Sequence, residues 1–308
     1  MERIISVVQT VLPVFLALAL GMLCRQRQIL SREGVDALKK VAVNLTLPFV
    51  LFDAFAKAEY SLSALAIPVL VFLVCCVALV LGFAVARLCA MEGRLSPFLA
   101  SGFEAGMLGY ALFVVLFPRI STSQFAILDL GQTLFVFTLY KGLLSGRSDW
   151  KAIGRDMMES PVLWAVFSGV LVGATGLYAR MAQWGVSGVV DAVTGFLAAP
   201  TGVIILLAVG YDLVLRGIPW KKTGGLIVMR LGVMAVLLGV VLLLNRTVLG
   251  GVIFEGAAVL LFILPPPYVI PVFADEPGER VQISSALSAM TLVTMILFAV
   301  CSVVIGLM

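Results

Sequence analysis

The chain contains no histidine. This absence excludes zinc peptidases of the H-E-x-x-H type and any proton relay that depends on imidazole. A group that changes its protonation state during function would therefore have to be a carboxylate. The sequence also lacks an obvious pair of nucleophile and base, so we expect neither an enzyme nor a bound cofactor or metal.

Cysteines are few and follow no pattern. The chain has five, without C-x-x-C spacing, and they lie within or beside apolar runs at Cys24, Cys75, Cys76, Cys89 and Cys301. Metal sites and redox-active disulfides are recognised by closely spaced cysteines. We therefore expect buried free thiols.

Charge is scarce as well. Only 12% of the residues are charged, whereas 62% are hydrophobic, and the mean hydropathy is +1.14. These values lie far outside the globular range and indicate a polytopic, all-α membrane protein. No polar stretch resembles a separate soluble domain, so a sensor joined to a signalling domain is disfavoured, and we expect no nucleic-acid partner.

The chain is rich in apolar runs of about 20 residues, the length that crosses the hydrocarbon core of a bilayer. A run at the start of the chain has no small-residue cleavage site and continues into Arg25 and Arg27, so we expect a retained span rather than a signal peptide. A polar linker at 146–159 separates two halves, 1–145 and 160–308, with five spans each. The ten predicted spans are 4–24, 37–55, 63–88, 96–118, 122–141, 160–178, 188–213, 223–245, 249–274 and 281–307.

Basic residues are distributed unevenly between alternate loops. Fifteen of the 21 lie after odd-numbered spans and five lie in the opposite loops. The positive-inside rule therefore predicts that both termini are extracytoplasmic, in the cell inner (plasma) membrane. Because each half has five spans, the second half must enter the membrane inverted. The remaining basic residue, Arg230, falls inside the eighth span, where we expect snorkelling or a carboxylate partner, with attraction of an anion as the alternative.

Two patterns recur in the same order in both halves and support an inverted repeat. One is a proline followed eight residues later by a glycine, and the other is a V-D-A motif followed by a proline. The first pattern occurs at Pro13 and Gly21 and at Pro161 and Gly169, and the second at 35–37 with Pro48 and at 190–192 with Pro200.

The ninth span cannot be a continuous helix. It contains Pro265, Pro266, Pro267 and Pro271, and each proline lacks an N–H and clashes with the carbonyl four residues before it. Irregular backbone at membrane depth is tolerated only where it is buried in protein or lines a cavity. This break is therefore a predicted ligand site.

The fourth span, which corresponds to the ninth in the repeat, is the weakest helix of its half. Gly102, Gly106 and Gly109 surround Glu104 in the sequence S-G-F-E-A-G-M-L-G-Y, which ends at Tyr110. Glycine costs a helix about 1 kcal/mol relative to alanine and tolerates other dihedral angles. We expect a second break here, with close helix packing through small residues as the alternative.

Several stretches together resemble one known family. They are V-L-P-V-F-L-A-L-A-L-G-M-L-C-R, V-N-L-T-L-P-F-V-L-F, the glycines at 106–109, I-L-D-L-G-Q-T-L-F-V-F-T-L and L-P-P-P. In this order and spacing they are similar to the auxin efflux carrier family of bacterial permeases, which includes the plant PIN-formed auxin exporters, over essentially the whole chain. The resemblance implies ten helices in two inverted five-helix repeats, with the fourth and ninth helices broken and crossing near the midplane. It also implies a carrier of dicarboxylates or auxin-like acids, with a scaffold side and a mobile transport side, and a homodimer.

The chain departs from the family at Glu104. Members typically have N-x-G-x-x-G-x-P at the first broken helix, and the matching positions here are Glu104, Gly106, Gly109 and Ala111. At 1.5 Å per residue, Glu104 lies about 12 Å in from Ser96, near the middle of the bilayer. Burial disfavours the charged form of a carboxylate, which suits Glu104 to proton coupling. The alternatives are a bound cation, a substrate that is not a simple anion, or a neutral side chain hydrogen-bonded to a neighbouring helix.

Other polar residues are candidates for the same site. Asp129 and Gln132 share a helix face and either line the pocket or join helices. Asn44 and Thr46 either contact the substrate or make interhelical hydrogen bonds. Tyr268 offers a ring and a hydroxyl beside the proline run. The predicted substrate-binding residues are Glu104, Gly106, Gly109, Tyr110, Pro265, Pro266, Pro267, Tyr268, Asn44, Thr46, Asp129 and Gln132.

Two half-helix N-termini at a crossing would attract an anionic group, and the carbonyls freed by the breaks would suit a cation. We therefore expect a secondary active transporter that moves a small organic acid by alternating access, with proton coupling through Glu104. The alternatives are a sodium-coupled symporter similar to the bile-acid transporters, an uncoupled facilitator and a channel.

Overall fold

The structure of the chain, a computed structural model, describes residues 2–58, 60, 62–145, 154–155, 158–213, 218, 220–274 and 277–307. All regular secondary structure within these residues is helical, which confirms the predicted all-α class. The chain divides into two compact units that interleave along the sequence. The first unit is Met1–Leu65, Gly106–Ile127 and Gly154–Asp212, and the second is Ala66–Ala105, Leu128–Ile153 and Leu213–Met308.

Long apolar helices account for most of the predicted spans. Within the described residues, six helices are long and apolar enough to cross a membrane, and the bent pair Pro161–Ala174 and Leu177–Gln183 is a seventh candidate. Of the remaining three predicted spans, 37–55 and 249–274 are interrupted helices, and 4–24 lies within α1 (Glu2–Gln26), of which the stretch Val11–Gln26 is counted as a shorter apolar helix. The chain is thus a multi-pass helical protein, and the number ten stays a prediction.

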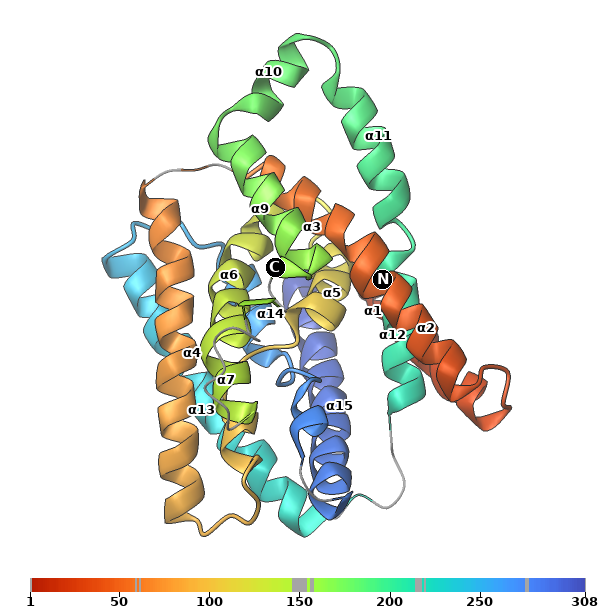
Figure 1. The fold of residues 1–308 in the computed structure, drawn as a ribbon, viewed down its shortest axis with the longest axis vertical. Helices are drawn as coiled ribbons and strands as arrows, with labels where there is room; N and C mark the ends of the chain where they lie inside the picture. Colours follow the sequence, from red (N-terminus) through yellow and green to blue (C-terminus); the bar gives the residue numbers. More distant parts are fainter. Residues whose placement is uncertain are drawn as a thin grey trace. The chain divides into compact units, whose positions relative to one another are not determined.

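The first unit holds the helices of the first, second, sixth and seventh predicted spans. They are α1 (Glu2–Gln26), α2 (Arg32–Val41), the π-helix η1 (Ala42–Thr46), α3 (Leu47–Ala56), α9 (Pro161–Ala174), α10 (Leu177–Gln183), α11 (Ser187–Ala198) and α12 (Thr201–Asp212). The unit also contains most of the π-helix η3 (Ala105–Gly109), all of α5 (Tyr110–Leu116) and the start of α6 (Ser123–Phe135). Helices α9 and α10 form a pair bent by 64°, and α11 follows α10 along the chain (Figure 1).

Two glycines of the predicted repeat permit close helix packing in the first unit. Helix α1 packs on α12, and α9 packs on α3. A Cβ atom added at Gly21 would overlap the carbonyl oxygen of Leu207 on α12, and one added at Gly169 would lie 2.8 Å from Cβ of Phe55 on α3. The matched glycines therefore lie at close helix contacts of this unit, where a larger residue would separate the backbones.

Proline interrupts the second and seventh predicted spans. Pro48 has no N–H to donate to the preceding turn, and the chain forms a π-turn, η1, immediately before α3. Pro200 lies in the turn between α11 and α12. The hydroxyl of Thr201 donates to the hydroxyl of Thr46 at 2.7 Å, and both side chains are buried. Each interruption thus places a threonine at the contact between the two spans.

The second unit contains the remaining helices. They are most of α4 (Leu62–Leu88), the 3₁₀ helix η2 (Ser96–Ala100), the later part of α6, the π-helix η4 (Val136–Tyr140), α7 (Lys141–Ser145), α13 (Trp220–Thr247), α14 (Glu255–Ile263), the 3₁₀ helix η5 (Ile270–Phe273) and α15 (Pro277–Leu307). Helix α13 packs on α14, α15 and η2 (Figure 1). This packing places the interrupted segments of the fourth and ninth predicted spans beside one long helix.

Both breaks predicted from the sequence are present. The first break, residues 101–104, separates η2 from η3, and the second break, residues 264–269, separates α14 from η5. Gly102 in the first break has φ +70°, a left-handed conformation that glycine adopts without strain. Glycine and proline have therefore interrupted these helices as the sequence predicts.

The predicted division into halves differs from the two compact units. Each unit takes spans from both 1–145 and 160–308. Most of the predicted linker at 146–159 lies outside the described residues. The two sequence halves thus stay a prediction about the repeat rather than a description of compact domains.

Candidate functional site

A hydrogen bond between backbone groups joins the two breaks. The amide N–H of Glu104 donates a hydrogen bond of 2.8 Å to the carbonyl oxygen of Pro265. In a continuous helix, backbone N–H and C=O groups form hydrogen bonds with other residues of the same helix. The two interrupted segments therefore supply hydrogen-bond partners to each other. We call residues 101–104 and 264–269 together the paired breaks.

The side chain of Glu104 adds a second link. Its Oε2 accepts a hydrogen bond of 2.6 Å from the backbone N–H of Tyr268. The residue is 9% exposed, so this carboxyl group lies in the interior of the second unit. A buried carboxyl group gains stability from such a donor because unpaired polar groups are costly in apolar surroundings. Glu104 thus connects the first break to the backbone just beyond the prolines.

Gly102 makes this approach sterically feasible. A Cβ atom at this position would lie 2.9 Å from Cγ and 3.0 Å from Cδ of Pro267. Pro265, Pro266 and Pro267 are all buried. Because Gly102 has no side chain, the ring of Pro267 can pack directly against its backbone at the paired breaks.

Arg230, in the middle of α13, is the largest correction to the sequence-based expectations. It does not snorkel, because it is 3% exposed, and among the described residues its guanidinium donates to backbone carbonyls rather than to a carboxylate. Nη1 bonds to Leu99 O at 2.9 Å, Nη2 bonds to Gly102 O at 2.9 Å, and Leu264 O accepts from Nη2 at 2.7 Å and from Nε at 3.3 Å. The carbonyls come from both interrupted spans. A lone arginine in an apolar span was the signal for this role, since such residues mark functional sites by default.

Gln132 on α6 binds the first break from another direction. Its Nε2 donates to Phe103 O at 2.8 Å, and its Oε1 accepts from Phe103 N at 3.4 Å. Asp129, one turn earlier on α6, accepts a hydrogen bond of 3.2 Å from the Thr133 hydroxyl. Both predicted residues are buried. The sequence left open whether this pair lines the pocket or joins helices. The contacts of Gln132 join α6 to the first break.

Tyr268 and the end of α14 are held by threonines of α15. The hydroxyl of Tyr268 lies 2.9 Å from that of Thr291, and Thr294 donates to Ile263 O at 2.6 Å. A narrow pocket in the second unit lies beside these groups. Its lining includes Arg230, Leu264, Pro265 and Thr294, together with apolar side chains of α13, α14 and α15. The pocket is small and mostly apolar, with polar groups at one side.

The remaining predicted residues belong to the first unit. Asn44 is exposed in η1, and Thr46 is buried against Thr201. Gly106 and Gly109 lie in η3. Tyr110 begins α5 and packs edge-on against Phe125, with ring centroids 5.0 Å apart. The structure therefore brings Glu104, Pro265, Tyr268 and Gln132 together in the second unit, where Pro266 and Pro267 also lie.

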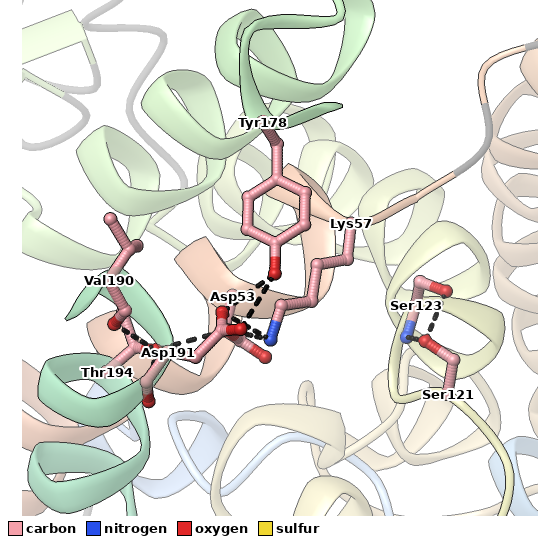
Figure 2. A network of polar contacts seen from close by, with 8 residues as sticks. All are labelled: Asp53, Lys57, Ser121, Ser123, Tyr178, Val190, Asp191 and Thr194. Atoms are coloured by element: carbon pink, nitrogen blue, oxygen red, sulfur yellow. Dashed lines mark hydrogen bonds and ion pairs between the residues drawn. The ribbon is translucent and has the colours of Figure 1, made fainter. Parts of the chain in front are cut away.

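A second polar cluster lies in the first unit (Figure 2). Nζ of Lys57 is 2.6 Å from a carboxylate oxygen of Asp53 and 3.0 Å from one of Asp191. The hydroxyl of Tyr178 donates to Asp191 at 2.8 Å, and that of Thr194 donates to Asp53 at 3.1 Å. Burial alone would lower the pKa of Lys57, but the hydrogen bonds to the two carboxylates outweigh it and raise this pKa above its usual value. The cluster joins α3, α10 and α11 as a partly exposed ion-pair network.

The carboxylates of Asp212 and Glu255 are also paired. Asp212 accepts from Arg32 at 2.6 Å and from Lys39, and Glu255 pairs with Arg246 at 2.7 Å. All five cysteines are free thiols, as predicted, but only Cys75 is buried. Cys89, which follows the end of α4, is exposed, and Cys24, Cys76 and Cys301 are partly exposed. The described residues include no group of three or more histidine, cysteine or acidic side chains that could hold a metal ion.

Comparison with known proteins gives two similarities. Residues 6–145 match a family described as "Membrane transport protein", the family that includes the auxin efflux carriers. A protein of Methanothermobacter thermautotrophicus described as an "Uncharacterized transporter" is 26% identical over 217 residues, which cover 68% of each chain. The family match bears out the resemblance predicted from the sequence motifs over residues 6–145.

Proposed function

Residues 6–145 match the membrane transport protein family, and we propose that the chain is a member of this family and a secondary active transporter of small organic acids. The family match favours a transporter over an enzyme. The observation that carries the more specific proposal is the pairing of two interrupted spans through Glu104. Broken helices at corresponding positions of two repeats are typical of the central site of a carrier.

The substrate proposed is a small carboxylate, either a dicarboxylate or an auxin-like acid. The paired breaks bring backbone N–H groups, the Tyr268 hydroxyl and an apolar pocket into one part of the second unit. An apolar wall with a few directed polar groups suits an organic acid better than an inorganic ion. The family resemblance supports the same class of substrate.

Proton coupling is assigned to Glu104. Its carboxyl group accepts the N–H of Tyr268, and in its ionised form it would repel a second carboxylate close by. Protonation removes that repulsion and weakens the bond to Tyr268 N–H, because a charged acceptor makes the stronger hydrogen bond. Binding of a proton to Glu104 therefore favours binding of an anionic substrate beside it.

Alternating access is proposed to involve movement between the two compact units. The first unit contains the first, second, sixth and seventh predicted spans together with residues 106–127 of the fourth and fifth, and the second unit contains the rest. Each unit thus takes equivalent spans from both predicted halves, as two inverted repeats require. The contact between Thr46 and Thr201 supports the same repeat. A homodimer in the bilayer, with both termini extracytoplasmic, completes the proposal.

The test is uptake of labelled mono- and dicarboxylates into proteoliposomes at two pH values, with wild type, Glu104→Gln and Glu33→Gln. Glutamine retains an oxygen that can accept from Tyr268 N–H, so Glu104→Gln should fold and lose the pH dependence of uptake. Glu33 is an exposed carboxylate on α2 and provides the matched control, whose pH dependence should equal that of wild type. Unchanged pH dependence in Glu104→Gln would exclude Glu104 as the coupling group. Absence of uptake of every acid by the wild type, under proton and sodium gradients, would exclude the substrate class.

A further inference from the structure

The carbonyl groups freed by the two breaks converge on one side chain. Leu99 and Gly102 belong to the fourth predicted span and Leu264 to the ninth, and all three carbonyl oxygens accept hydrogen bonds from Arg230. Carbonyl oxygens of unwound backbone are the groups that coordinate sodium in carriers with broken helices. Oxygen is also the ligand that hard cations require. In this chain a guanidinium occupies the position where such oxygens gather.

The groups around Arg230 stabilise the positive charge of its guanidinium. Four hydrogen bonds to three oxygens use most of the five donors of the guanidinium. The ring of Phe103 lies 5.7 Å from Cζ, close enough for a cation–π contact. Within the described part of the chain, Arg230 has no carboxylate partner among the ion pairs, so carbonyl dipoles and an aromatic face compensate its charge.

We propose that Arg230 is a built-in cation that takes the place of a mobile coupling ion at the paired breaks. Neither Na⁺ nor K⁺ binds there, and transport by this chain is independent of both ions. The proposal rests on the transport function proposed above and deepens it, because it selects against the sodium-coupled alternative. Arg230 acts through the backbone that it holds, and it is a positioning residue for the site around Glu104.

Geometry explains why arginine suits this position. The planar guanidinium presents donors in a fixed fork and remains charged at neutral pH. It can therefore reach oxygens of two different segments at once, whereas the ammonium of lysine is a compact point charge. A neutral side chain would leave several carbonyls unpaired in an apolar interior, which is costly. Removing the side chain should create a vacancy that accepts a free guanidinium ion.

The first experiment measures thermal unfolding of purified Arg230→Ala with guanidinium chloride at low concentration. We expect Arg230→Ala to unfold about 5 °C or more below wild type. Guanidinium at about 10 mM should recover part of that loss, since a ligand that binds only the folded state stabilises it. Sodium and potassium chloride at the same concentration should not. Arg246→Ala, at an exposed arginine near the end of the same helix, is the matched control and should show no guanidinium response.

The second experiment measures uptake. Wild type should transport at the same rate in sodium, potassium and choline media, and Arg230→Ala should transport on the order of 10-fold more slowly. Guanidinium should restore part of the uptake. The proposed function and this inference fail separately, because thermal unfolding tests the cation position even if wild type transports no carboxylate.

Three results would overturn the proposal. The first is stabilisation of wild type by sodium or a strict need for sodium in uptake. The second is a folded Arg230→Ala protein that guanidinium neither stabilises nor reactivates. The third is a sodium requirement for uptake by Arg230→Lys, a variant that keeps a tethered charge and replaces the alanine variant if the latter does not fold. We expect Arg230→Lys to transport more slowly than wild type without any sodium requirement.

Discussion

The hydroxyl of Thr201 donates a hydrogen bond to the hydroxyl of Thr46 at 2.7 Å, and each threonine lies eleven residues after the valine of a V-D-A motif. The two residues therefore occupy the same position in the two predicted repeats. A residue that contacts its own counterpart lies on a two-fold axis, as in an isologous interface between subunits. This contact supports an internal two-fold relation between the second and seventh predicted spans.

Replacement of Thr46 or Thr201 by valine should lower stability by about 0.5–2 kcal/mol, because each change leaves a buried hydroxyl without its partner. The double replacement Thr46→Val with Thr201→Val should cost less than the two single changes added together. The measurement is a double-mutant cycle by thermal unfolding in detergent. Additive costs would show that the two hydroxyls do not interact.

Gly102→Ala should damage the paired breaks. The new Cβ atom would lie within 3.0 Å of the Pro267 ring, and alanine is strained at φ +70°, so we expect a loss of about 1–3 kcal/mol. Thermal unfolding and carboxylate uptake measure the effect. Gly239→Ala is the matched control, because a Cβ atom at that position of α13 has no neighbour within 4 Å. Equal behaviour of the two variants would mean that the breaks do not need glycine at 102.

Gln132→Met should destabilise the second unit although the side chain keeps its length. The change leaves both the N–H and the carbonyl of Phe103 without the amide that binds them, which should cost about 1–3 kcal/mol. Gln124→Met makes the same substitution at an exposed position of α6 and should be close to neutral in thermal unfolding. A neutral Gln132→Met would show that water or another group can replace the amide.

Lys57→Met should lower stability by about 0.5–1 kcal/mol, because it leaves Asp53 and Asp191 close together without their shared cation. Adding Asp191→Asn should recover most of the loss. The pKa of Lys57 is raised in the folded protein, so its contribution is complete below its usual pKa of about 10.4 and is lost only above the raised value. Denaturation at pH 7 and pH 9 should therefore give the same difference between wild type and Lys57→Met. A difference that disappears by pH 9 would contradict this assignment.

The sequence predicted the helical class and the position of both breaks. Pro265, Pro266 and Pro267 interrupt the ninth predicted span, and Gly102 turns the fourth. These outcomes are local, because proline cannot donate a backbone hydrogen bond and glycine adopts left-handed angles wherever they occur. The sequence also singled out Glu104 and Gln132 as buried polar residues of the same region.

The partners of the buried polar groups were beyond local inference. Arg230 was expected to snorkel or to pair with a carboxylate, and it binds three carbonyls from two other spans. Asn44 and Thr46 formed one candidate pair, whereas the structure exposes Asn44 and buries Thr46. Helical spacing shows which residues share a face, but it does not show which neighbouring helix meets that face.

The sequence by itself determined that this chain is an apolar helical protein whose fourth and ninth spans cannot run straight, because composition and backbone chemistry act within a few residues. Only the tertiary structure decided that the two breaks bind each other through Glu104 and that Arg230 donates hydrogen bonds to the carbonyl groups that the breaks leave without helical partners. These contacts join segments more than 100 residues apart in sequence, as between Arg230 and Gly102. They form because a polar group buried in an apolar interior is costly unless it is hydrogen-bonded.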